Sequence, residues 1–144
     1  MRSDAVSADS ALCVDGRSLT LEDVERASRR GFSGFELDND ARDAMQRSRL
    51  RVREVLESGA TVYGVNTGFG HFAQVRVDGD NLEQLQLNLV RSHAVGVGEP
   101  LPVEAVRALI LLRANVLARG HSGAHPRVAD QLLRLLDHDI CPLV

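Results

Sequence analysis

The sequence predicts a mainly α-helical fold with a short strand near the N-terminus and a glycine-rich loop in the first half. Helix start and stop residues flank five segments. An apolar run at 11–14 precedes the turn-like pair Asp15-Gly16, which indicates the strand. Segment 61–77 holds three glycines and has no helical period, which indicates the loop. The helices are expected at residues 21–30, 39–58, 81–95, 102–119 and 126–138.

Several boundaries rest on single residues. Thr20 has the character of an N-cap, and Asp23 three positions later makes a weak capping box. The glycine-rich stretch 31–35 is expected to be a turn. Asp80 is expected to cap the third helix, and Pro102 suits the first turn of the fourth.

The fourth expected helix is apolar on every side, and Gly120 is expected to close it. A helix of this kind is normally buried all round. Five helices offer few neighbours to surround it, so we expect the chain to form one layer of a larger helical assembly. The apolar residues are Val103, Val106, Leu109, Ile110, Leu111, Leu112, Val116 and Leu117.

Composition excludes several classes of protein. The net charge is −3, from 17 basic and 20 acidic residues, so nothing indicates a nucleic-acid or membrane partner. No apolar run reaches the ~18 residues of a membrane span. Residues 1–10 lack the pattern of a secretory signal and are expected to be a disordered tail before one domain, 11–144. Cys13 and Cys141 predict reduced thiols in a cytoplasmic protein, and no histidine spacing indicates a metal.

The strongest local signal is the segment YGVNTGFG, which begins at Tyr63, the only tyrosine. Such loops bend sharply and often carry function. The lysine and Ser/Thr of a phosphate loop are absent. Residues 68–73 match the loose dinucleotide fingerprint, but the sequence that follows is not helical. A plain turn with a packed tyrosine stays open as an alternative.

A second segment, LVRSHAVGVG, ends the third expected helix. At this C-terminal end, the helix dipole would stabilise the positively charged form of His93. A surface or capping histidine is the plainer alternative. Ser92 either orients a ring nitrogen of that histidine or is ordinary polar surface.

Taken together, YGVNTGFGHFA, LQLNLVRSHAVGVGEPL and LLRANVLARGHSG resemble the histidine ammonia-lyase branch of the aromatic amino acid lyases, over roughly residues 10–144. The resemblance implies the N-terminal part of a helical, aspartase/fumarase-like fold, tetrameric and with active sites shared between subunits. It implies elimination of ammonia from an L-amino acid, with L-histidine giving urocanate. The cofactor implied is 4-methylidene-imidazole-5-one (MIO), formed from an internal Ala-Ser-Gly.

The resemblance also implies roles for single residues. Tyr63 matches the tyrosine that removes the β-proton, and His93 matches the position that reads the substrate side chain. Ser92 completes what looks like a histidine-specific pair. Asn66 and Gly70 lie in the tyrosine loop and are expected to shape the pocket for the substrate.

One departure from the family pattern is large. The sequence contains Ser122-Gly123-Ala124 but no Ala-Ser-Gly, so this chain is not expected to form MIO or to be active alone. We expect a C-terminal lyase chain carrying Ala-Ser-Gly, in a tetramer-like hetero-oligomer, or else a longer lyase of which this is an excerpt. Two other functions stay open. One is a lyase or aminomutase for another aromatic or carrier-bound amino acid, and the other is a non-catalytic scaffold or binding subunit.

Overall fold

The computed structural model describes residues 10–63, 65–67 and 79–144. Two compact units make up this structure. Unit 1 contains the described part of Met1–Arg49 together with Pro100–Val144, and unit 2 is Leu50–Glu99. The expected tail lies, apart from Ser10, outside the described residues, and so does Gly70. In the part of the chain that is described, no helix combines the length and apolar character needed to cross a membrane.

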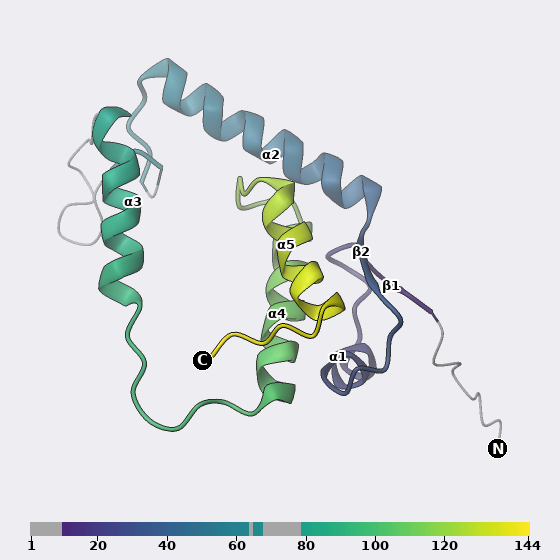
Figure 1. The fold of residues 1–144 in the computed structure, drawn as a ribbon. Coiled ribbons are helices and arrows are strands. Elements are labelled where there is room, and N and C mark those ends of the chain that lie inside the picture. Colours follow the sequence, from purple (N-terminus) through teal and green to yellow (C-terminus); the bar gives the residue numbers. More distant parts are fainter. Residues whose placement is uncertain (1–9, 64, 68–78) are drawn as a thin grey trace. The chain divides into compact units, whose positions relative to one another are not determined.

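The fold is mainly helical, which confirms the predicted class (Figure 1). All five expected helices are present, and the expected strand is present as β1. In chain order the elements are β1 (Leu12–Val14), α1 (Leu21–Ser28), β2 (Phe35–Leu37), α2 (Asn39–Ser58), α3 (Gly79–His93), α4 (Val103–Ala118) and α5 (Pro126–Asp137).

Local capping explains where α1 and α2 begin. The amide of Asp23 donates to Thr20 Oγ1 at 3.1 Å, and the amide of Thr20 donates to Asp23 Oδ2 at 3.0 Å. These reciprocal bonds confirm the predicted capping box. At the start of α2, the amide of Ala41 donates to Asp38 Oδ1 at 3.0 Å, so Asp38 satisfies an amide that the helix leaves unpaired.

The predicted turn at 31–35 is wrong at its end, because Phe35 begins a second strand. β2 pairs in parallel with β1, with Leu12 opposite Phe35 and Val14 opposite Leu37. Phe35 and Leu37 are buried and the residue between them is exposed, which is the alternation of a half-buried strand. Three residues are too few for this period to stand out from a sequence.

Two helix starts also differ from expectation. α3 begins at Gly79 rather than 81, so Asp80 lies inside the helix instead of capping it, and α3 ends at His93 rather than 95. At that end the amide of Val95 donates to the carbonyl of His93 at 2.8 Å, a tight turn that leaves the helix. Pro102 precedes α4 as its N-cap, because its ψ of 144° is extended.

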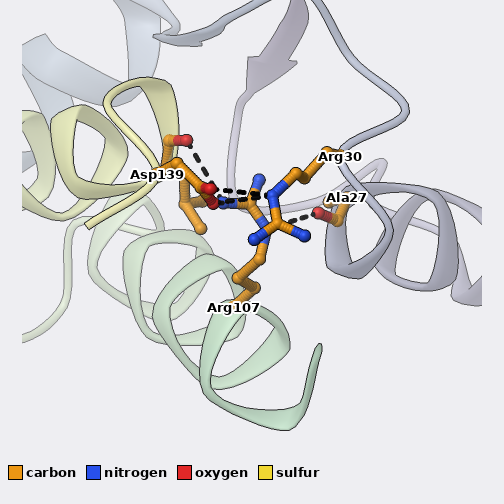
Figure 2. A network of polar contacts seen from close by, with 5 residues as sticks. Ala27, Arg30, Arg107 and Asp139 are labelled. Carbon is orange, nitrogen blue, oxygen red and sulfur yellow. Dashed lines mark hydrogen bonds and ion pairs between the residues drawn. The ribbon is translucent and has the colours of Figure 1, made fainter. Parts of the chain in front are cut away.

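The core of unit 1 lies where α4 packs on α1 and α5, with β2 against α5 (Figure 1). α4 contributes Val106, Ile110, Leu111, Ala114 and Leu117 to it. A buried arginine on the same side of α4, Arg107, bonds to the ends of α1 and α5 (Figure 2).

The opposite side of α4 is apolar but exposed. Leu109, Leu112 and Val116 are 47%, 44% and 52% exposed. The described residues therefore leave one side of α4 uncovered, as the small number of helices led us to expect, and a larger assembly that covers this side stays a prediction. The helix has apolar side chains on both sides, and the described residues cover one of them.

Candidate functional site

The loop that carries Tyr63 is a tight turn directly after α2. Gly59 ends the helix with a φ of +72°, in the left-handed region that favours glycine. The amides of Val65 and Asn66 then donate to the carbonyl of Val62 at 3.1 Å and 3.2 Å, which reverses the chain around Tyr63. Tyr63 is 63% exposed.

Asn66 holds the turn closed from inside. Its Oδ1 accepts from the amide of Val62 at 2.9 Å, and its Nδ2 donates to the carbonyl of Ala60 at 2.7 Å. The residue is only 3% exposed. Both ends of the amide are thus engaged with the backbone of its own loop. This geometry fits a side chain that positions Tyr63, and the expectation that Asn66 shapes the pocket for the substrate stays a prediction.

Ser92 and His93 lie together in the last turn of α3, and both are exposed. Ser92 Oγ donates to the carbonyl oxygen of Leu89 at 2.9 Å. The Nδ1 of His93 lies 2.9 Å from the same oxygen and 3.0 Å from Ser92 Oγ. The carbonyl of Leu89 is a partner that the sequence does not indicate, because it belongs to the main chain.

The four predicted site residues that the structure describes all belong to unit 2: Tyr63, Asn66, Ser92 and His93. They lie in two parts of unit 2. One is the turn after α2 that carries Tyr63 and is closed by Asn66, and the other is the last turn of α3, which carries Ser92 and His93. Gly70, the fifth predicted residue, lies outside the described residues. Each part presents a group that can exchange or share a proton with a ligand, a phenol in one and an imidazole in the other.

Unit 1 contains a separate groove of about 520 Å³ between β2 and α5, lined partly by charged residues. Its central charges are paired with each other, since Arg42 Nη1 and Nη2 donate to the two oxygens of Asp130 at 2.9 Å and 2.7 Å. These bonds lower the pKa of Asp130, against the opposing effect of its partial burial. None of the predicted site residues lines this groove, and its paired charges fit a structural role.

Among the residues described, no group of three or more histidine, cysteine or acidic side chains could hold a metal ion. Cys13 and Cys141 are both free thiols. Partial burial, followed by the nearby carboxylate of Asp38, raises the pKa of the Cys13 thiol, so this cysteine is less reactive than an ordinary one.

The chain matches known lyases over most of its length. A family model described as aromatic amino acid lyase covers residues 19–144. A histidine ammonia-lyase of Anaeromyxobacter sp. (strain K) is 51% identical over 133 residues, which is 92% of this chain and 26% of that protein. One of Geobacillus thermodenitrificans (strain NG80-2) is 53% identical over 135 residues, again 92% and 26%.

Solved structures agree with the sequence matches. A tyrosine aminomutase from Streptomyces globisporus superposes with a TM-score of 0.86 at 34% identity, covering 93% of this chain and 25% of that one. The chain therefore spans about a quarter of the length of these relatives. Since the family model matches far more than half of the residues, the chain belongs to the aromatic amino acid lyase family.

Proposed function

We propose that this chain contributes the N-terminal part of a histidine ammonia-lyase active site, which eliminates ammonia from L-histidine to give urocanate. The observation that carries the proposal is the exposed Tyr63 on a turn clipped by Asn66, in a chain about half identical to histidine ammonia-lyases. The exposed Ser92–His93 pair at the end of α3 supports the choice of an imidazole substrate.

In this proposal Tyr63 is the base. Its side-chain oxygen takes the β-proton of the substrate, the C–H electron pair becomes the new carbon–carbon double bond, and the bond to nitrogen breaks as ammonia leaves. The β-proton is weakly acidic, so a base must be held in position. The short turn after Gly59 and the bonds of Asn66 supply that positioning.

The implied MIO group would have to come from residues outside these 144, because the sequence contains no Ala-Ser-Gly. Two tripeptides, Ser58-Gly59-Ala60 and Ser122-Gly123-Ala124, contain the same three residue types in another order, and neither fits the cofactor. The amide of Gly123 donates to Ser48 Oγ at 2.9 Å, which ties this turn to α2. When present, MIO supplies the electrophile that helps the amino group to leave. From this chain, Tyr63 would take the β-proton and His93 would bind the side chain of the substrate.

We also propose that the Ala-Ser-Gly segment belongs to a helical body that covers the exposed side of α4, in the same polypeptide or in a second chain of a tetramer-like assembly. The exposed Leu109, Leu112 and Val116 support this, because an apolar patch rimmed by polar residues marks an interaction surface.

A chimaera tests the function directly. The corresponding N-terminal quarter of the Geobacillus thermodenitrificans relative would be replaced by this chain, and urocanate formation from L-histidine would be followed by absorbance. We expect turnover by the chimaera, none by this chain alone, and a loss of at least about 100-fold on Tyr63→Phe. The intact relative is the positive control. A chimaera of native size that forms no urocanate would contradict the proposal.

A second candidate is an aminomutase, favoured by the superposition on a tyrosine aminomutase. The same chimaera would be supplied with L-tyrosine and with other aromatic amino acids, and the products would be separated to detect a β-amino acid. Binding of L-histidine without any product would instead favour a non-catalytic scaffold.

A further inference from the structure

Among the residues that the structure describes, the imidazole of His93 has polar contacts through one nitrogen, Nδ1. Its Nδ1 lies 2.9 Å from the carbonyl oxygen of Leu89, one helical turn earlier. A carbonyl oxygen accepts hydrogen bonds and cannot donate them. The contact is therefore a hydrogen bond only if Nδ1 carries the hydrogen.

Ser92 also favours a hydrogen on Nδ1 of His93. Its hydroxyl donates to the same carbonyl of Leu89 at 2.9 Å, so the hydroxyl proton is already committed. Ser92 Oγ then faces Nδ1 of His93 at 3.0 Å with its lone pairs, as a second acceptor. In the other neutral tautomer, the lone pair of Nδ1 would point at the lone pairs of the carbonyl oxygen, which is repulsive.

The location of the Leu89 carbonyl oxygen, Ser92 Oγ and His93 Nδ1 also favours a hydrogen on Nδ1. They belong to the last turn of α3, where the carbonyl ends of the peptide dipoles gather and favour a donor with partial positive charge. All three lie within five residues of one helix, so the arrangement depends on that helix end alone. His93 is exposed, which leaves the remainder of the ring accessible to a ligand.

We propose that the end of α3 fixes His93 as the Nδ1–H tautomer, so that Nε2 is a hydrogen-bond acceptor for the ring N–H of an azole amino acid. Ser92 is then a positioning residue, which acts through His93. The proposal rests on the proposed function and adds the direction of the recognising bond. A phenylalanine ring, which has no N–H or O–H, would leave Nε2 without a hydrogen-bond partner. A site with such an unmatched polar group discriminates strongly against the substrate that leaves it unmatched.

The tautomer is tested first, without any assay of activity. The full chain would be labelled with ¹⁵N in its histidines, and the ring nitrogens of His93 would be assigned with a His93→Gln variant. At about pH 8, where an imidazole is neutral, protonated and unprotonated ring nitrogens give well-separated signals. We expect Nδ1 to be protonated and Nε2 unprotonated. A protonated Nε2, or an even mixture of the two tautomers, would overturn the proposal.

The role of Ser92 is tested in the assembled chimaeric lyase. Ser92→Ala is expected to raise KM for L-histidine about fivefold with a smaller change in kcat, since one modest hydrogen bond to the imidazole is lost. Ser92→Thr, which keeps the hydroxyl, is expected to restore KM. Ser28 is the matched control, because its hydroxyl makes the same bond to a carbonyl three residues earlier at the end of α1, with no imidazole beside it. Ser28→Ala should leave KM unchanged.

The two tests separate two kinds of failure. The Nδ1–H tautomer in a chimaera that makes no urocanate would refute the proposed function but not the anchoring of the ring. Urocanate formation with the Nε2–H tautomer, or with KM unaffected by Ser92→Ala, would refute this inference and leave the lyase function standing.

Discussion

Arg107 on α4 and Asp139, just beyond α5, are joined by a short ion pair in which Nη1 lies 2.8 Å from Oδ1 (Figure 2). The Arg107 side chain is 2% exposed, and it also donates to the carbonyls of Ala27 at 3.1 Å and Leu136 at 3.3 Å. Arg30 completes the cluster by donating to both oxygens of Asp139. One buried guanidinium therefore ties the ends of α1 and α5 to α4.

Removing that guanidinium should destabilise unit 1. Arg107→Met keeps a long side chain but removes the bonds of the guanidinium to two helix-end carbonyls and to Asp139, so we expect the free energy of unfolding to fall by about 2 kcal/mol. Urea denaturation measures the change. Arg113→Met on the exposed side of α4 is the matched control and should change stability little. Equal effects of the two substitutions would contradict this role for Arg107.

Asp139 carries a second constraint, because its φ of 54° lies in the left-handed region. Asparagine tolerates this backbone and keeps an oxygen for Arg107, whereas alanine loses the oxygen and is strained there. We therefore expect Asp139→Ala to lower the melting temperature clearly more than Asp139→Asn. Equal losses would show that the charge alone matters, and that the left-handed backbone does not.

Features that depend on residues close in sequence were predictable. The spacing of Thr20 and Asp23 predicted the capping box, and a glycine-rich motif drew attention to Tyr63. The strand β2 was not predictable in the same way, since its three residues become a strand only by pairing with β1, more than twenty residues earlier. Local pattern carries no trace of such a distant partner.

The same limit applies to side chains that bond to the backbone. The sequence predicted that Asn66 shapes the substrate pocket, but it did not predict that both ends of the Asn66 amide bond to main-chain atoms of its own turn. Arg107 drew no attention in the sequence, because its acceptors include the carbonyls of Ala27 and Leu136, on two other helices. Main-chain acceptors look alike at every position, so the sequence does not identify them.

The positioning role of Asn66 can be measured in the chimaeric lyase. Asn66→Ala removes the two side-chain bonds that help to close the tyrosine turn, and a displaced base reduces the rate steeply. We expect kcat to fall at least about tenfold, with a smaller change in KM for L-histidine. Asn66→Asp keeps the acceptor for the amide of Val62 and should lose less. A rise in KM with kcat unchanged would instead indicate direct substrate binding by Asn66.

Gly120 allows a close approach of the chain to α2. A Cβ added there would lie 2.7 Å from both the backbone carbon and the Cβ of Ala44, and the φ of Gly120 is +72°. Gly120→Ala should therefore cost about 2 kcal/mol of stability, from backbone strain together with the clash. Gly96, whose added Cβ would meet nothing within 4 Å, is the control. Gly96→Ala should be close to neutral by thermal unfolding, and a similar cost at both sites would contradict the argument.

The ion pair between Arg42 and Asp130 predicts a particular loss of stability in acid. The hydrogen bonds from Arg42 lower the pKa of Asp130 in the folded chain, whereas an unfolded aspartate titrates near pH ~3.9. Its contribution is therefore present above the unfolded value and is lost as the pH falls through the lower, folded value. Asp15, whose pKa is lowered chiefly by the amides of Ser18 and Arg17, adds an acid dependence of the same sign.

Asp130→Asn isolates the contribution of this carboxylate, because Asp15 is present in both proteins and its effect subtracts out. Melting temperatures of the two proteins would be measured from neutral pH down to about pH 2. We expect the unsubstituted chain to be the more stable at neutral pH, and the difference to shrink below about pH 4 as Asp130 takes up its proton. A difference that stays constant across this range would mean that the ion pair contributes nothing through its charge.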